Sequence, residues 1–189
     1  AEKMGVDTMR WLYASQNPER NLLFGYEIAD EVRKNLITLW NTYSFFVTYA
    51  NLDGFDPKEY NFDDVELSIL DKWVLAKMNN FIDVSKKYYE NYELFKLMNE
   101  ASLILDDISN WYVRRNRRRF WKSENDIDKH GAYLTLYNVL IIYIKALAPV
   151  IPFLTDEIYN NLVIEHDQDF ESSIHLCDFP KVNKNFINE

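Results

Sequence analysis

Residues 133–148 read YLTLYNVLIIYIKALA, and this stretch decides the fold class. Lys145 is its only charged side chain, so a helix formed here would be apolar nearly all round rather than along one face. Pro149 and Pro152 end such a helix, because proline lacks the backbone N–H that a helix interior requires. The stretch therefore predicts a buried helix at the centre of a helical core.

The segments around this stretch repeat apolar residues at steps of three and four, the spacing of amphipathic helices. The pattern occurs in five segments: 4–14, 27–49, 67–88, 92–121 and 152–163. Only four glycines and five prolines occur in 189 residues, too few turn-forming residues for a fold of many strands. The sequence predicts an all-α fold: an antiparallel bundle of four long helices with flanking short helices and a mostly extended C-terminal tail.

The bulk composition indicates one folded domain, with or without a tail. Hydrophobic residues make up 48% of the chain, which supports a sizeable core. The single cysteine excludes an internal disulfide and fits a reducing compartment, which favours the cytoplasm. No run of about 18 uncharged apolar residues occurs, so no membrane span is predicted. No signal peptide is recognised, and the opening Ala1-Glu2-Lys3 lacks an initiator methionine, which favours a piece of a longer protein.

Arginine occupies five of the six positions in the segment 114–119, which reads RRNRRR. The whole chain has a net charge of −9, from 21 basic and 30 acidic residues, so its positive charge is concentrated here. Four aromatic residues flank the run: Trp111, Tyr112, Phe120 and Trp121. Guanidinium groups beside aromatic rings suit RNA, because they bind phosphates and stack on bases. The acidic remainder argues against general affinity for nucleic acid, DNA included, so any RNA contact must be local.

The sequence contains no pattern of catalytic or metal-binding residues. The three histidines, His130, His166 and His175, are scattered, and none has a partner at metal-ligand spacing. A glycine-rich phosphate loop and the serine and cysteine nucleophile signatures are also missing. The sequence therefore predicts no catalytic residue, no metal site and no cofactor in this chain.

Residues 110–121, NWYVRRNRRRFW, resemble a signature of isoleucyl-tRNA synthetases, with Asn116 in place of a serine. Other segments resemble class I synthetase elements in the same order: 5–11 (GVDTMRW), 33–41 (RKNLITLWN), 71–75 (DKWVL), 148–159 (APVIPFLTDEIY) and 173–176 (SIHL) followed by Pro180. The proline-containing element alone fits valyl, leucyl and methionyl relatives as well. The arginine run is what selects the isoleucyl family.

The resemblance implies the helical anticodon-binding region of such a synthetase, with tRNA(Ile) as its partner. The family's two ATP-handling signatures, His-x-Gly-His and Lys-Met-Ser-Lys-Ser, do not occur in this chain. The resemblance thus assigns ATP and magnesium to a catalytic domain, and proofreading to an editing domain, elsewhere in the same polypeptide. Residues 1–25 would follow the catalytic core, 26–164 would form the bundle and 165–189 the tail.

On a helix of about 100° per residue, most basic side chains of the run share an arc of about 140°. They are predicted to contact RNA: Arg114, Arg115, Arg118, Arg119 and Lys122. For Arg114 and Arg115, a salt bridge in the core is an equal alternative. Arg117 lies outside this arc beside Val113 and Phe120, and is predicted to be structural, with its guanidinium paired to a carboxylate such as Asp106.

Two alternatives remain open from the sequence. One is the equivalent domain of a valyl or methionyl synthetase. The other is a helical protein-interaction module whose arginine-rich face binds an acidic partner, because a basic run also pairs with carboxylates.

Overall fold

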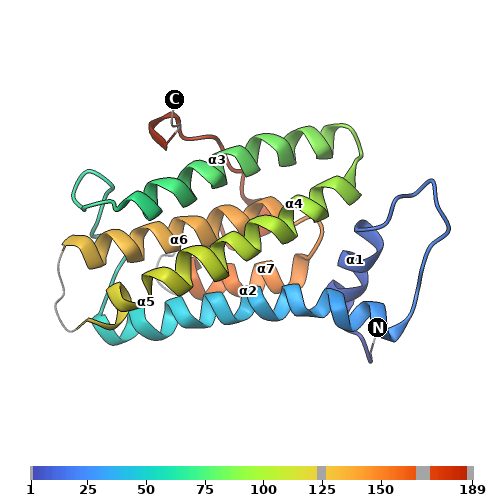
Figure 1. Cartoon of the computed structure of the whole chain (residues 1–189), viewed down its shortest axis with the longest axis horizontal. Coiled ribbons are helices and arrows are strands. Elements are labelled where there is room, and N and C mark those ends of the chain that lie inside the picture. The colour runs from blue at the N-terminus through green and yellow to red at the C-terminus, as the bar shows by residue number, and fades with distance from the viewer. Residues whose placement is uncertain (1, 123–126, 165–170, 187–189) are drawn as a thin grey trace.

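The computed structural model describes residues 2–122, 127–164 and 171–186, whose regular structure is entirely helical (Figure 1). Seven α-helices follow one another in this part of the chain: α1 (Val6–Ala14), α2 (Tyr26–Asp53), α3 (Ile69–Glu90), α4 (Leu94–Asp106), α5 (Arg114–Trp121), α6 (Ile127–Leu147) and α7 (Pro152–Tyr159). A π-helical segment, Asp107–Val113, joins α4 to α5 without a break, and a second, Asn160–Ile164, continues α7. The predicted all-α class is confirmed.

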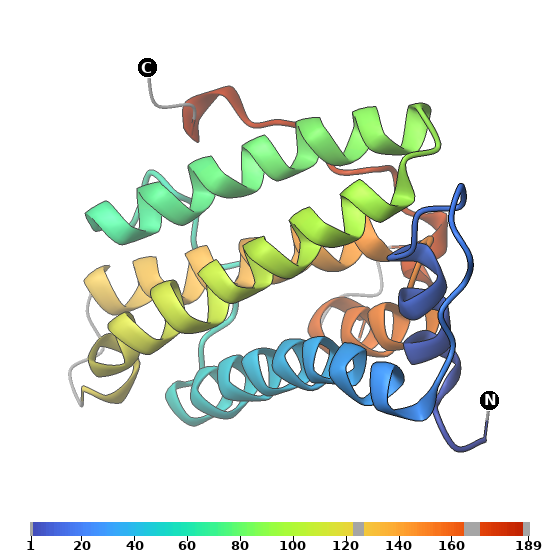
Figure 2. The ribbon, with the colours of Figure 1, turned by 45° about the vertical axis from the view of Figure 1, so that its right-hand side comes forward.

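The long helices run in alternating directions along the chain, as Figures 1 and 2 show. The rods are α2, α3, the continuous α4–α5 rod and α6. α1 lies against one end of the bundle and α5 lies at the other. The described part of the tail forms two short 3-10 turns, Ile174–Leu176 and Lys184–Phe186, joined by irregular backbone.

α6 is the central helix, as its apolar circumference predicts. Thirteen of its 21 residues are buried, and it packs against α2, α3, α5 and α7. Tyr143 and Ile144 are completely buried, and the rings of Tyr133 and of Phe120 from α5 form a T-shaped pair with 5.1 Å between their centres. None of the helices in the described ranges is long and apolar enough to cross a lipid bilayer.

α1 and the tail are packed into the same core as the bundle. Trp11 of α1 and Ile174 of the tail are almost completely buried. Asp7 accepts a hydrogen bond of 2.7 Å from the backbone N–H of Leu154, in the first turn of α7. Arg10 donates to the carbonyl oxygen of Val150 at 2.7 Å, just before that turn. Two polar side chains of α1 therefore hold it to the start of α7.

Gly131 allows the connection between α2 and α3 to pass directly over α6. The backbone N–H of Glu66, in this connection, donates to the carbonyl oxygen of Ile127 at 3.3 Å. A Cβ added at Gly131 would lie 2.2 Å from the carbonyl oxygen of Glu66, far inside van der Waals contact. The close crossing of these two backbones therefore requires glycine.

We expect Gly131→Ala to lower the free energy of unfolding by about 1–3 kcal/mol, the usual cost of overpacking. At an open position in a helix interior, replacing glycine by alanine would instead stabilise the protein by about 1 kcal/mol. A loss of stability in Gly131→Ala would therefore come from the close approach of the two backbones. Gly25→Ala is the matched control, because Gly25 has extended backbone and no atom near its would-be Cβ. Urea denaturation of the two variants and the wild type checks this, and a Gly131→Ala protein as stable as Gly25→Ala would contradict it.

Candidate RNA-binding surface

Helix α5 carries the arginine run, and its two buried positions hold the uncharged residues Asn116 and Phe120. Asn116 and Phe120 are 4% and 1% exposed. The amide of Asn116 donates to the carbonyl oxygen of Tyr112 at 3.0 Å, and the ring of Phe120 packs against Phe45 at 5.2 Å. The remaining positions of α5 are left for arginines at the edge or the outside of the bundle.

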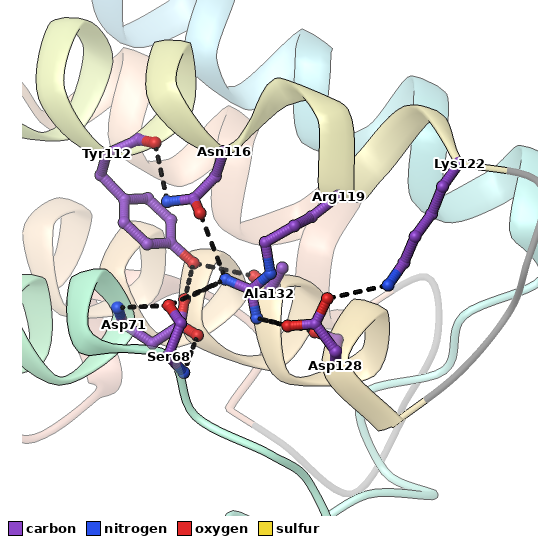
Figure 3. Close-up of polar contacts among 8 residues, drawn as sticks. All are labelled: Ser68, Asp71, Tyr112, Asn116, Arg119, Lys122, Asp128 and Ala132. Atoms are coloured by element: carbon purple, nitrogen blue, oxygen red, sulfur yellow. Dashed lines mark hydrogen bonds and ion pairs between the residues drawn. The ribbon is translucent and has the colours of Figure 1, made fainter.

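Arg119 is the arginine that faces the protein interior, with 14% of its side chain exposed (Figure 3). Its guanidinium donates to Asp71 at 2.8 Å and to Ser68 at 3.2 Å, both at the start of α3. On its other side it pairs with the Asp128 carboxylate at 2.8 Å and donates to the Asp128 carbonyl oxygen at 2.7 Å. Arg119 thus joins the beginnings of α3 and α6 to α5.

Asp71 is the centre of this network and is fully buried. Its carboxylate closes a capping box with Ser68, because each residue accepts a hydrogen bond from the other's backbone N–H, at 2.7 Å and 3.2 Å. The Tyr112 hydroxyl donates to the same carboxylate at 2.6 Å. Burial, with the Asp71 charge beside the hydroxyl, raises the pKa of Tyr112 well above its usual value. Tyr112 therefore stays a neutral donor.

The charges of this network also shift the pKa values of Arg119 and Asp128. Burial disfavours the charged guanidinium, but hydrogen bonds and attraction from Asp71 outweigh it and raise the pKa of Arg119. Burial likewise disfavours the Asp128 carboxylate, but hydrogen bonds from Lys122 and Arg119 outweigh it and lower its pKa. Lys122 lies 2.8 Å from Asp128 (Figure 3).

The other four arginines of the run are exposed: Arg114, Arg115, Arg117 and Arg118. No ion pair joins any of them to a carboxylate within residues 2–122, 127–164 and 171–186. Two of them lie over exposed indole rings instead. The guanidinium carbon of Arg115 is 4.3 Å from the ring centre of Trp111, and that of Arg117 is 6.0 Å from Trp121.

The expectation that Arg117 is the buried, paired arginine is wrong: Arg117 is exposed and Arg119 holds the buried pair. At about 100° per residue, both arginines lie about 80° from the midline of the buried positions Asn116 and Phe120, on opposite sides. Helix geometry makes the two flanks equivalent, but Asp71 and Asp128 lie on only one of them. The position of the carboxylates decides which arginine is buried.

The π-helical segment explains why the buried stripe of α4 does not continue in α-helical register into α5. In α4 the buried positions include Leu97, Ala101 and Ile104, and α-helical spacing would extend this stripe to Arg115 and Arg119. A π-helical turn holds about one residue more than an α-helical turn. The stripe therefore advances by one residue, from Arg115 to Asn116 and from Arg119 to Phe120.

Sequence reasoning missed two members of the polar interior. Lys129, at the start of α6, has 2% of its side chain exposed and pairs with Asp53 at the end of α2. A lysine in a polar helix start is ordinarily solvated, so no signal pointed to it. Asp71 had a signal, because the Ser68-x-x-Asp71 spacing is that of a capping box, but the spacing does not predict the ion pair with Arg119.

No group of three or more His, Cys, Asp or Glu side chains within the described ranges is placed to hold a metal ion. The His130 ring lies against the Tyr60 ring in a tilted arrangement, with 4.3 Å between ring centres, and Nε2 of His175 lies 3.2 Å from the carbonyl oxygen of Pro152. His166 lies outside the described residues.

Comparison with known proteins identifies the family of this chain. The family described as the anticodon-binding domain of tRNA ligase matches residues 71–189. The chain belongs to this family. It is also similar to isoleucine–tRNA ligases along almost its whole length: 44% identical to that of Clostridium novyi over 97% of the chain, 43% to that of Clostridium tetani over 100%, and 44% to that of Dehalococcoides mccartyi over 100%.

The anticodon-binding domain described here spans 18% or 19% of the length of these curated relatives. All three relatives are isoleucine–tRNA ligases, which favours the isoleucyl interpretation over a valyl or methionyl domain and over a protein-interaction module. Within the domain the run divides into two groups. Arg119 and Lys122 already have carboxylate partners, whereas four arginines face outward.

We expect Arg119→Ala to lower the free energy of unfolding of this domain by about 3–5 kcal/mol, because it leaves the buried Asp71 charge uncompensated. Arg117→Ala removes the same side chain from the exposed flank, and its cost should stay within about 1 kcal/mol. Urea denaturation of the two variants measures the difference. Equal stability of the two proteins, or a less stable Arg117→Ala, would contradict the assignment of the buried pair.

The lowered pKa of Asp128 predicts that its ion pairs weaken in acid. A carboxylate with a lowered pKa in the folded protein stabilises the fold fully above its unfolded pKa of about 3.9, and this contribution is lost as the pH falls through the lowered value. We therefore expect the wild type to lose more stability than Asp128→Asn between about pH 5 and pH 2. The difference should be modest, because 35% of the side chain is exposed. Thermal unfolding across this pH range measures it, and parallel curves for the two proteins would contradict it.

Proposed function

We propose that this chain is the tRNA-binding domain of an isoleucine–tRNA ligase, which attaches isoleucine to tRNA(Ile) with ATP and magnesium in the cytoplasm. The catalytic and editing parts would lie elsewhere in the same polypeptide, and the domain would hold the RNA without taking part in bond making. The observation that carries the proposal is the set of four exposed arginines without a carboxylate partner in the described ranges. Their charge is available for phosphate.

The charge distribution supports a local RNA contact. The chain has 30 acidic and 21 basic residues, so most of its surface repels phosphate and the arginine run attracts it. Charged groups on a surface interact over a Debye length of about 8 Å at physiological ionic strength. RNA would therefore be held at the arginine run and repelled from the rest of the domain, which sets where the RNA lies.

The place of the run in the bundle supports an RNA contact remote from the reaction centre. α5 lies at the end of the bundle opposite α1 (Figures 1 and 2). α1 carries the segment that resembles the one following the ATP-handling loop of class I synthetases. α3, which extends along the bundle, has 22 residues and a length of about 33 Å. A bound RNA would thus reach the arginine run on the side of the domain away from the catalytic part.

The proposed contacts are the outward-facing residues: Arg114, Arg115, Arg117 and Arg118. Arg119 and Lys122, which the arc of the run also suggested, are proposed to position α5 rather than to touch RNA. Moving either guanidinium or ammonium group to a phosphate would break its ion pair with Asp71 or Asp128. The four exposed arginines have no competing carboxylate partner within residues 2–122, 127–164 and 171–186.

We expect Arg114→Ala/Arg118→Ala to weaken binding of tRNA(Ile) to the purified chain. The slope of log K against log salt should fall by roughly 1.4–1.8, the value for two lost phosphate contacts. Lys34→Ala/Lys87→Ala is the matched control, because it removes two exposed cations that sit in local pairs with Glu31 and Asp83. Fluorescence anisotropy at several salt concentrations measures both slopes.

An unchanged slope in the arginine variant, or an equal loss in the lysine control, would contradict the proposed contact surface. Heparin serves as the competing polyanion. Equal affinity for heparin and tRNA(Ile) would favour the alternative of a general acidic partner. Isoleucine-dependent ATP–pyrophosphate exchange by the purified chain would overturn the assignment of the chemistry to another part of the polypeptide.

A further inference from the structure

Lys129, at the start of α6, is a buried cation with 2% of its side chain exposed. An ammonium group is costly to remove from water unless it is paired and hydrogen-bonded. It pairs with the carboxylate of Asp53 at the end of α2, which also accepts a hydrogen bond from the Tyr133 hydroxyl. The same ammonium donates to the backbone carbonyl oxygen of Lys122 at 2.8 Å. Partners on two other segments thus compensate the buried charge.

The carbonyl group that Lys129 binds lies at the C-terminus of the arginine helix, because α5 ends at Trp121 and Lys122 is its C-cap. The last carbonyl groups of a helix have no partner within the helix, and the helix dipole places partial negative charge there. An ammonium group satisfies both conditions. Lys129 therefore caps α5 from a different helix, and Asp53 holds the ammonium in place.

α5 has little helical stability of its own. Its eight residues are fewer than the about 12–15 that an isolated helix needs in water. Like charges four residues apart destabilise a helix further. α5 contains two such pairs, Arg114 with Arg118 and Arg115 with Arg119. The first turn continues the π-helical segment and is held by that rod, so the last turn is the part that needs an anchor at its end.

We propose that Lys129 is a positioning residue for the RNA-binding surface: its cap keeps the last turn of α5 helical, with Arg117 and Arg118 held in a fixed array. The inference rests on the proposed tRNA-binding function and adds a buried residue that does not itself touch RNA. Arg119 anchors the inward flank of the same turn through Asp71, and Lys129 anchors its end. An array that is ordered before binding loses less conformational entropy when RNA arrives, so it binds more tightly.

The place of the cap separates the exposed arginines into two groups. The carbonyl oxygen of Arg118 accepts the hydrogen bond of 3.1 Å from the Lys122 backbone N–H, directly beside the capped carbonyl group. Arg114 lies in the first turn of α5, next to the π-helical segment. Loss of the cap should therefore disturb Arg118 and leave Arg114 in place, whereas a general loss of stability would affect both alike.

The test uses Asp53→Asn/Lys129→Met, which removes the cap together with its partner charge, so that no buried charge is stranded. Arg118→Ala and Arg114→Ala are each measured in the wild type and in this double variant, by anisotropy with tRNA(Ile) at several salt concentrations. In the wild type each should lower the slope of log K against log salt by about 0.7–0.9. In the double variant Arg114→Ala should keep this effect, and that of Arg118→Ala should fall to about half or less, because contacts that share an element are not additive.

Asp53→Asn alone is the matched control, because it removes the same ion pair but keeps Lys129 and its bond to the Lys122 carbonyl oxygen. It should retain the wild-type salt slope. Amide hydrogen exchange in residues 118–122 should become about tenfold faster or more in Asp53→Asn/Lys129→Met and stay near wild type in Asp53→Asn, because the cap controls local opening.

An effect of Arg118→Ala that is equal in the wild type and the double variant, or an equal reduction for both arginine variants, would overturn the positioning role. A double variant whose circular dichroism melt shows no folded state would likewise overturn a role confined to α5. If Arg114→Ala/Arg118→Ala still loses RNA in these cases, the proposed function stands and only the cap fails. If neither arginine variant changes the slope in the wild type, the proposed function fails, and hydrogen exchange still tests the cap.

Discussion

The buried carboxylate of Asp71 is the constraint on which the arginine end of the molecule depends. A charge removed from water is tolerated only when it is paired and hydrogen-bonded, and Asp71 is fully buried. Its partners come from three different elements: Ser68 before α3, Tyr112 in the π-helical segment and Arg119 in α5. Arg119 then reaches Asp128 at the start of α6. Moving one of these helices would strand a charge, so α5 is held in one orientation.

The π-helical segment decides which side chains of α5 face the solvent. Without the extra residue, the buried stripe of α4 would continue through Arg115 and Arg119, and two guanidinium groups would need partners inside the bundle. The shift by one residue gives these interior positions to Asn116 and Phe120. Only Arg119 remains at the edge of the core, where two carboxylates meet it. The other arginines are released to the outside together with Trp111.

The arginine run lies at one end of the domain, and the rest of the chain is acidic overall. Under the proposed function, an acidic domain with one arginine-rich stretch would hold RNA in one place, because phosphate is repelled wherever the arginines are absent. This stretch lies at the end of the bundle opposite α1, which is itself fixed to the start of α7 by Asp7 and Arg10. The hydrophobic core around α6 reaches both ends of the bundle, because it includes Trp11 of α1 and Phe120 of α5. Orientation of the RNA relative to the remainder of a longer ligase would then follow from the rigidity of the bundle.

The sequence by itself determined the helical class, the central position of α6 and the presence of one basic stretch in an acidic domain. Helical spacing and an apolar circumference leave a segment such as 133–148 no other place than the core, whatever its neighbours are. The roles of the individual arginines were decided only by tertiary structure. Arg117 and Arg119 flank the buried stripe symmetrically, so local spacing cannot distinguish them, and the carboxylates that do so come from α3 and α6. The burial of Lys129 against Asp53 is of the same kind. A charge is buried where a distant partner compensates it, and that partner is found only when the helices are packed.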